Sequence, residues 1–200
     1  FVVLYTDEPN PETGERNFNK PESQRMSEAQ KAWLNRALES CSGDKHVFVF
    51  MHHPRWIGNN YGDDWENVHQ ILARAGNVRA CFAGHIHHMR YDGVRDGIGY
   101  YTLATVGGHQ SGHAPRAGWL HQYHVVTVRD DGYSVVAYPV GAALDPEAIT
   151  AEVSRAAESL ARELTPRFER TPTIVGERFS GEWVSTWTNP TDFPVELDLH

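Results

Sequence analysis

Histidine is the residue type through which this sequence could do chemistry, and most of its histidines lie in one stretch. Eleven of the twelve fall within residues 46–124. Two groups directly follow apolar runs: His52-His53-Pro54 comes after residues 46–51, and Gly84-His85-Ile86-His87-His88 comes after residues 78–83. Neutral imidazoles gathered at one place suit a borderline transition metal. The pattern therefore predicts a metal site, provided that the fold brings the two groups together.

The segment between the two histidine groups is predicted to form a helix, and this helix would bring the two groups together. Asp63 or Asp64 can begin a helix, and Gly76 can end it. One face of that helix would carry Trp65, Val68, Ile71 and Leu72. A right-handed strand–helix–strand crossover brings the carboxyl ends of two parallel strands to one edge of a sheet. The residue skipped in His85-Ile86-His87 lets both imidazoles reach one site while Ile86 points away, provided that the backbone there is extended.

Composition narrows the class of protein. With 200 residues and 40% hydrophobic content, the chain can bury the core of one domain and part of a second. The net charge is −8, but residues 145–200 hold eleven acidic and five basic side chains, against 15 and 13 before them. The histidine-bearing part is thus nearly neutral and lacks the basic face that nucleic-acid binding requires. No apolar stretch approaches membrane-spanning length.

Other patterns predict the remaining elements of the histidine-bearing part. A capping box of Ser27 and Gln30 begins a helix. Its core-facing residues are expected to be Trp33, Leu34, Ala37 and Leu38. Two hairpins are predicted, one joining residues 89–92 to 97–106 and the other joining residues 120–129 to 133–138. Single histidines outside the two groups have plainer interpretations: His46 and His69 are expected to be solvated, and His124 to lie hydrogen-bonded in the core.

The histidine motifs, taken with the helix between them, resemble those of one known family. Met51-His52-His53-Pro54, a helix, and then Phe82-Ala83-Gly84-His85-Ile86-His87 are similar to the C-terminal half of a calcineurin-like metallophosphoesterase. The resemblance covers about residues 1–145. It implies an α/β fold, a two-sheet sandwich flanked by helices, present here incompletely and followed by the start of a β-rich C-terminal module.

The resemblance also implies a dinuclear metal site. Carried over position by position, His52 and His85 match ligands of one metal, and His87 matches a ligand of the other. The ions would be divalent or trivalent manganese, iron, zinc or nickel, with their identity left open. The family's earlier motifs, Asp-x-His, Gly-Asp-x-x-Asp and Gly-Asn-His-Asp/Glu, are absent from these 200 residues. Because the bridging aspartate, the asparagine ligand and the assisting histidine belong to those motifs, no catalytic residue is assigned here.

The implied activity is metal-assisted hydrolysis of a phosphomonoester or phosphodiester by a metal-bound hydroxide. Chain direction predicts one wall of the substrate pocket, because residues 55–64 leave the site edge directly after the first histidine group. Arg55 could pair with a phosphate oxygen. Trp56 and Tyr61 could pack on the leaving group, and His53 is assigned to the substrate side rather than to the ligands.

A second wall is predicted at residues 107–113, since the chain returns beside His85 and His87 after the first hairpin. Two glycines there allow close approach, and His109 or His113 could contact phosphate or water. The expected partner is a small phosphate ester, with no nucleic acid; the oligomeric state is left open.

The domain organisation follows from the resemblance and from the change of pattern toward the C-terminus. Residues 1–144 would be the C-terminal part of the phosphoesterase domain. Residues 145–170 would form a helical connector that opens at Asp145-Pro146. Short strands at residues 173–177, 182–188 and from 194 onward indicate that residues 171–200 start a β-sandwich-like module.

Both ends of the chain are expected to be cut. Residues 1–5 read as a buried strand without a lead-in, and residues 194–200 as a strand just beginning. The compartment is therefore open, with a periplasmic or secreted location among the alternatives. We expect the isolated chain to bind at most one metal weakly and to lack useful turnover, because three neutral imidazoles cannot bridge two dications.

Two other classes of function stay open. One is a phosphoesterase fold kept only for binding or interaction, against which the three histidines at ligand positions argue. The other is a structural zinc site built from histidines alone, although no cysteine pair is present to complete it. Metal stoichiometry would separate the three readings: two metals, none, or one held in a closed site.

Overall fold

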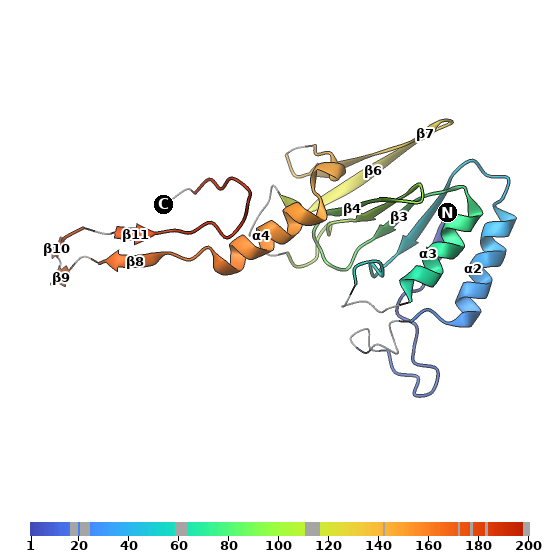
Figure 1. The fold of residues 1–200 in the computed structure, drawn as a ribbon, viewed down its shortest axis with the longest axis horizontal. Coiled ribbons are helices and arrows are strands. Elements are labelled where there is room, and N and C mark those ends of the chain that lie inside the picture. The colour runs from blue at the N-terminus through green and yellow to red at the C-terminus, as the bar shows by residue number, and fades with distance from the viewer. Residues whose placement is uncertain are drawn as a thin grey trace. The chain divides into compact units, whose positions relative to one another are not determined.

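The computed structural model describes residues 1–16, 20, 25–58, 64–110, 117–141, 143–171, 173–176, 178–182 and 184–197. Figure 1 shows the order of the elements along the chain. The chain divides into two compact units, Phe1–Ala151 and Glu152–His200. The first unit carries both histidine groups. The domain boundaries expected at residues 144 and 170 stay predictions.

A five-stranded sheet is the centre of the first unit. Its order is β1-β2-β3-β5-β4, and its strands are β1 Val2–Leu4, β2 Val47–Met51, β3 Val78–Ala83, β4 Arg90–Arg95 and β5 Ile98–Thr102. Strands β1, β2, β3 and β5 pair in parallel, and β4 runs antiparallel at one edge. The carboxyl ends of β2 and β3 therefore lie at the same edge of the sheet, as the crossover predicts.

Two helices cover one face of this sheet (Figure 1). Helix α2 spans Glu28–Ser40 and begins at Ser27, whose hydroxyl accepts the Gln30 amide at 3.1 Å. Helix α3 spans Trp65–Ala75 and ends at Gly76, which has a left-handed φ of 75°. The predicted crossover helix is thus present with its predicted end. Its buried residues join the core formed with β1, β2 and α2: Val2, Leu34, Leu38, Val49, Val68 and Leu72.

A two-stranded hairpin packs on the opposite face. Strands β6 Gln122–Arg129 and β7 Gly132–Pro139 pair antiparallel. Val126, Tyr133 and Val135 pack against the aromatic core residues of the sheet, Phe48, Phe82 and Tyr101. A 3-10 turn at Pro146–Ala148 (η2) follows. The first unit therefore has helices on one side of a mixed sheet and a second, smaller sheet on the other, in agreement with the expected α/β class.

Several side chains lie elsewhere than the sequence pattern suggests. Trp33 is 42% exposed, whereas Leu34 and Leu38 are buried as expected. Only half of the capping box forms, because the Gln30 side-chain oxygen accepts the Tyr5 amide at 2.7 Å instead of the Ser27 amide, which donates to Glu8 at 2.7 Å. The solvated position expected for His69 is wrong: this side chain is fully buried. These differences arise from tertiary contacts that a helical period does not encode.

The second unit contains one helix and two small sheets. Helix α4, Ala151–Glu163, begins one residue before the unit boundary. Strands β8 Arg167–Arg170 and β11 Val184–Thr186 form one antiparallel pair, and β9 Thr173–Val175 and β10 Arg178–Ser180 form another. Residues 194–197, expected to begin a strand, are irregular. Within the ranges that the structure describes, no helix is long and apolar enough to span a membrane.

Candidate metal centre

The histidine groups stand where the parallel strands end. His52 directly follows β2, and His85 follows β3 after one glycine. The Gly84 amide donates to the His52 carbonyl at 3.0 Å, which joins the two strand ends through the main chain. A Cβ at Gly84 would lie 3.9 Å from that same oxygen. The sheet thus brings together two segments that lie far apart in sequence.

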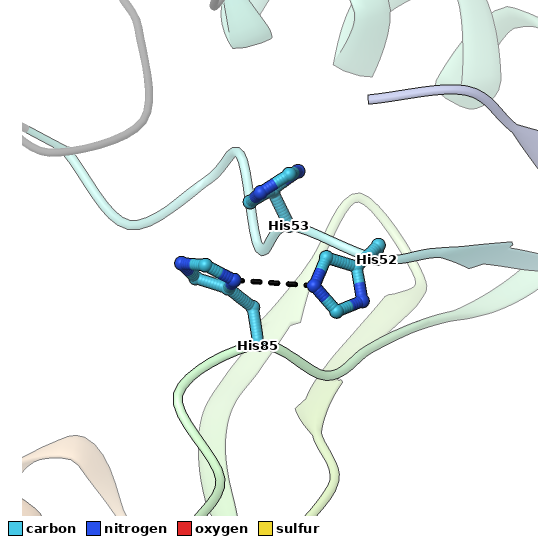
Figure 2. A group of neighbouring side chains, drawn as sticks. All are labelled: His52, His53 and His85. Atoms are coloured by element: carbon cyan, nitrogen blue, oxygen red, sulfur yellow. Dashed lines mark hydrogen bonds between the residues drawn. The ribbon is translucent and has the colours of Figure 1, made fainter. Parts of the chain in front are cut away.

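Three imidazoles gather at this edge, as Figure 2 shows: those of His52, His53 and His85. One ring nitrogen of each lies within 4.8 Å of the other two. His85 Nδ1 and His52 Nε2 share a hydrogen bond of 3.2 Å, and the His53 ring centroid is 4.3 Å from that of His85. An ion held by imidazole nitrogens has bonds of about 2.0–2.1 Å, so two of its ligand nitrogens stand about 3.3 Å apart, close to the spacing of this His52–His85 pair.

The backbone that presents His85 and His87 is not extended. Their φ angles are 71° and 65°, in the left-handed region that residues with a side chain seldom adopt. The extended backbone on which the His-Ile-His geometry was conditional is therefore not present at His85 and His87. Such φ angles persist where surrounding contacts hold them, and they concentrate at functional sites. The two imidazoles belong to one tight turn rather than to the end of a strand.

His87 lies at the same cavity but outside the three-imidazole group. A cavity of about 320 Å³ is bounded by His52, His85 and His87 together with the ends of β2, β3 and β5. The Nδ1 atom of His87 lies 2.5 Å from the main-chain oxygen of His109. The three residues assigned as ligands therefore share one cavity, and their roles as ligands stay predictions.

His53, assigned to the substrate side, is buried directly behind this cavity. Its Nδ1 and its main-chain amide each lie 3.0 Å from the Thr6 hydroxyl oxygen. Burial, together with the neighbouring His85 and His52, lowers the pKa of His53 to about 4. Burial also lowers the pKa of His85, helped by His52 and His87. Both imidazoles are thus neutral at pH 7, the form that binds metals.

The first residue of the predicted first wall is internal. Arg55 is 5% exposed, and its guanidinium donates to the Thr6 carbonyl. Burial lowers the pKa of Arg55, and the carboxylates of Asp64, Asp7 and Glu8 oppose that shift. In this arrangement Arg55 is hydrogen-bonded to the segment after β1. The Arg55 side chain would have to turn outward to bind phosphate.

Aromatic side chains of the same wall take part in packing. Trp56 donates its indole N–H to Asp92 at 2.9 Å, and its ring lies 5.0 Å from the ring of Tyr100. Trp56 therefore packs against protein partners, and its contact with a leaving group stays a prediction. Tyr61 and His113, also assigned to the substrate side, lie outside the described residues.

Residues 107–110, the described part of the predicted second wall, lie beside His87, and their contact with substrate stays a prediction. Residues 107–109 are exposed, and the loop touches His87 through the His109 carbonyl rather than through the His109 imidazole. His121 Nε2 donates to the Gly108 carbonyl at 2.9 Å and supports the loop from β6. Sequence reasoning missed Thr6 altogether. A lone threonine after a short strand gives no signal until the fold places it against His53.

The donor set fits a borderline transition metal, because imidazole nitrogen is a preferred ligand of zinc, copper, iron and nickel. Within the described part of the chain, the group that could hold an ion consists of His52, His53 and His85. It brings no negative charge, so these side chains alone do not balance two dications.

Comparisons with known proteins agree with the motif. The family model described as calcineurin-like phosphoesterase matches residues 5–89, the segment that holds both histidine groups, so the resemblance is confirmed there. Among solved structures, a dimetal phosphatase from Danio rerio is 18% identical and has a TM-score of 0.39. That match covers 60% of this chain and 38% of the other, so the chain spans well under half of that phosphatase. Curated proteins gave no significant match.

Proposed function

We propose that this protein, whose residues 5–89 match the calcineurin-like phosphoesterase family, is part of a metal-dependent phosphoric ester hydrolase. The observation that supports the proposal most is the meeting of His52, His85 and His87 around one cavity at the carboxyl edge of the sheet. These three would hold the metal, with His52 and His85 on one ion and His87 on a second. The substrate would be a small phosphomonoester or phosphodiester.

Bound metal would supply an activated water and neutralise the charge that develops on the phosphate oxygens. The residues of this chain would supply position. The rings of His52 and His85 already lie together, with His85 Nδ1 3.2 Å from His52 Nε2. An ion bound by both nitrogens would take the place of the hydrogen that they share. The Gly84 amide fixes the distance between the strand ends. Pre-set ligands lose little freedom when an ion binds, which favours affinity.

His53 would act on the substrate side. Thr6 Oγ1 accepts the His53 main-chain amide, and the Thr6 hydroxyl can donate its own hydrogen to His53 Nδ1. That pairing would leave Nε2 carrying a hydrogen, so the neutral ring would be a donor for a phosphate oxygen rather than a ligand. Arg55, Trp56, Tyr61, His109 and His113 are proposed as further contacts of the substrate.

Metal content and turnover test this function together. We expect the complete protein to bind two transition-metal ions and to hydrolyse a chromogenic phosphoester. His52→Ala should abolish both, whereas His46→Ala, at the opposite edge of the sheet, should leave both in place. The 200-residue chain alone should take up at most one ion. A complete protein that binds metal without hydrolysing phosphomonoesters or phosphodiesters would instead indicate a binding module.

A further inference from the structure

His87 is held by the segment that follows β5, through both its side chain and its main chain. The His109 carbonyl lies 2.5 Å from His87 Nδ1. The Gln110 side-chain nitrogen donates to the His87 carbonyl at 3.0 Å, and the Thr105 amide donates to the same oxygen at 3.1 Å. Three hydrogen bonds from residues 105–110 thus converge on one histidine.

These contacts determine which ring nitrogen of His87 carries the hydrogen. A main-chain carbonyl only accepts, so Nδ1 must be the donor to His109. In the neutral imidazole the lone pair then lies on Nε2. Metal-binding histidines are commonly oriented in this way, with the second ring nitrogen donating to a carbonyl or carboxylate. The loop therefore leaves His87 in the form that can bind an ion through Nε2.

Gly108 makes this close approach feasible. A Cβ at position 108 would lie 2.7 Å from Thr105 Oγ1 and 3.2 Å from His87 Cε1, both closer than ordinary contact. The Gly108 amide donates to that same threonine oxygen at 2.7 Å. A Cβ at Gly107, by contrast, would meet nothing within 4 Å. One glycine of the pair is therefore required by the packing against His87, and its neighbour is not.

We propose that Thr105, Gly108, His109 and Gln110 are the positioning residues of the metal centre. Gln110 holds the left-handed turn at His87, and His109 positions His87 through its carbonyl rather than its imidazole. The inference rests on the proposed function in one respect, that His87 binds metal. It goes beyond the proposed contact of the His109 side chain with substrate, and it assigns Gln110 a role that no sequence motif indicates.

Metal titration of the complete protein tests the proposal, with Co²⁺ as a probe whose visible absorption reports coordination. Gln110→Ala and Gly108→Ala should each weaken binding by about 10- to 100-fold, the usual effect of losing a partner that orients a ligand. Gly107→Ala is the matched control and should bind within about twofold of the wild type. His109→Ala keeps the carbonyl and should also retain its Co²⁺ affinity, whatever its effect on substrate.

Equal affinity of Gln110→Ala and the wild type would overturn the proposal. A second measurement does not depend on metal or on the folding of a variant: long-range ¹H–¹⁵N correlation spectra of the metal-free wild type report the tautomer of His87. We expect the Nδ1–H form, and the Nε2–H form would contradict the inference. If the wild type takes up no metal, the proposed function fails, and the tautomer still decides whether the loop positions His87 as described.

Discussion

Histidines lie at both edges of the central sheet, but their ring nitrogens make different contacts at each edge. At the carboxyl edge, His52 and His85 bond to each other beside a cavity. At the amino edge, His46 precedes β2, and both of its ring nitrogens are engaged. Nε2 donates to the Arg129 carbonyl at 2.8 Å, and Nδ1 accepts the Arg79 Nε at 3.2 Å. Of the two histidines that flank β2, His52 thus lies beside a cavity and His46 is held by hydrogen bonds to the protein.

The polar groups at the amino edge are hydrogen-bonded to one another, although a cavity also lies there. The other Arg79 nitrogens donate to the Gly76 carbonyl at 3.3 Å and the Lys45 carbonyl at 3.2 Å. Lys45 pairs with Asp130 at 2.9 Å. The hollow beside these residues measures about 680 Å³, larger than the cavity at the histidine cluster. The use of ring nitrogens therefore distinguishes a candidate site from a structural contact better than the size of a hollow does.

Replacing one histidine at each edge should give the largest difference. Sites with four ligands bind zinc with about 10–16 kcal/mol, so one ligand accounts for about 3–4 kcal/mol, or about 100- to 1,000-fold in affinity. We expect a loss of this size for His85→Ala in the complete protein and no change for His46→Ala. Isothermal titration with Zn²⁺ measures both, and equal losses in the two variants would erase the contrast between the edges.

The sequence predicts the carboxyl edge well because its signals are local and periodic. The apolar runs, the amphipathic stripe of α3 and Gly76 determine the crossover, and the crossover alone brings His52 and His85 together. The turn at His85 and His87 could not be predicted in the same way. The left-handed turn at His87 is accompanied by contacts from residues 105–110, which are distant in sequence.

The buried His69, which lies between the two edges, also could not be predicted from local sequence patterns. His69 lies on α3, where its position on the helix predicts solvent. In the structure, Nδ1 bonds to the Tyr100 hydroxyl at 2.6 Å and Nε2 to the Asp96 carboxylate at 2.7 Å. Both partners come from the β4–β5 hairpin, and nothing in the helix sequence indicates that they will meet it. Histidines with two engaged nitrogens should therefore affect folding and leave metal binding intact.

His69→Ala tests whether a histidine with two hydrogen-bonded ring nitrogens affects folding rather than metal binding. Its expected effect, on the free energy of unfolding, is the second largest. Removing the ring leaves a cavity and deprives Tyr100 and Asp96 of a partner, so the free energy of unfolding should fall by roughly 2–3 kcal/mol. Urea denaturation followed by circular dichroism measures the change. Gln70→Ala, at the exposed neighbouring position, should stay within about 0.5 kcal/mol of the wild type. A stable His69→Ala variant with weakened metal binding would reverse the assignment.

His124 gives an effect that depends on pH and is small near neutral pH. Burial lowers its pKa to about 4, and its Nε2 lies 3.2 Å from the Met89 sulfur. Between pH 6.5 and 4 the unfolded chain binds a proton at this position that the folded chain does not, so stability falls as the pH falls. One such group contributes at most about 1.4 kcal/mol per pH unit.

His124→Met should therefore flatten the dependence of unfolding free energy on pH between about 4 and 6.5. His53, whose pKa is also lowered to about 4, remains in both proteins and cancels in the comparison. Denaturation curves at several pH values in this window measure the difference in slope. Parallel curves for wild type and variant would show that His124 can take up a proton in the folded state, and that its burial is not a constraint on folding.

The exposed ion pair at the amino edge should have the smallest effect. Lys45 and Asp130 side chains are 66% and 93% exposed, so water and salt screen their attraction. Such pairs contribute about 0.2–1 kcal/mol. We expect Lys45→Ala to lower the free energy of unfolding by less than about 1 kcal/mol and to leave Zn²⁺ affinity unchanged, since the Lys45 carbonyl that holds Arg79 is retained. Denaturation at low and high salt tests this, because a screened pair should lose its contribution as salt rises. A larger loss of unfolding free energy that does not change with salt would contradict this prediction. It would mean that the Lys45 charge is needed for the structure of the amino edge.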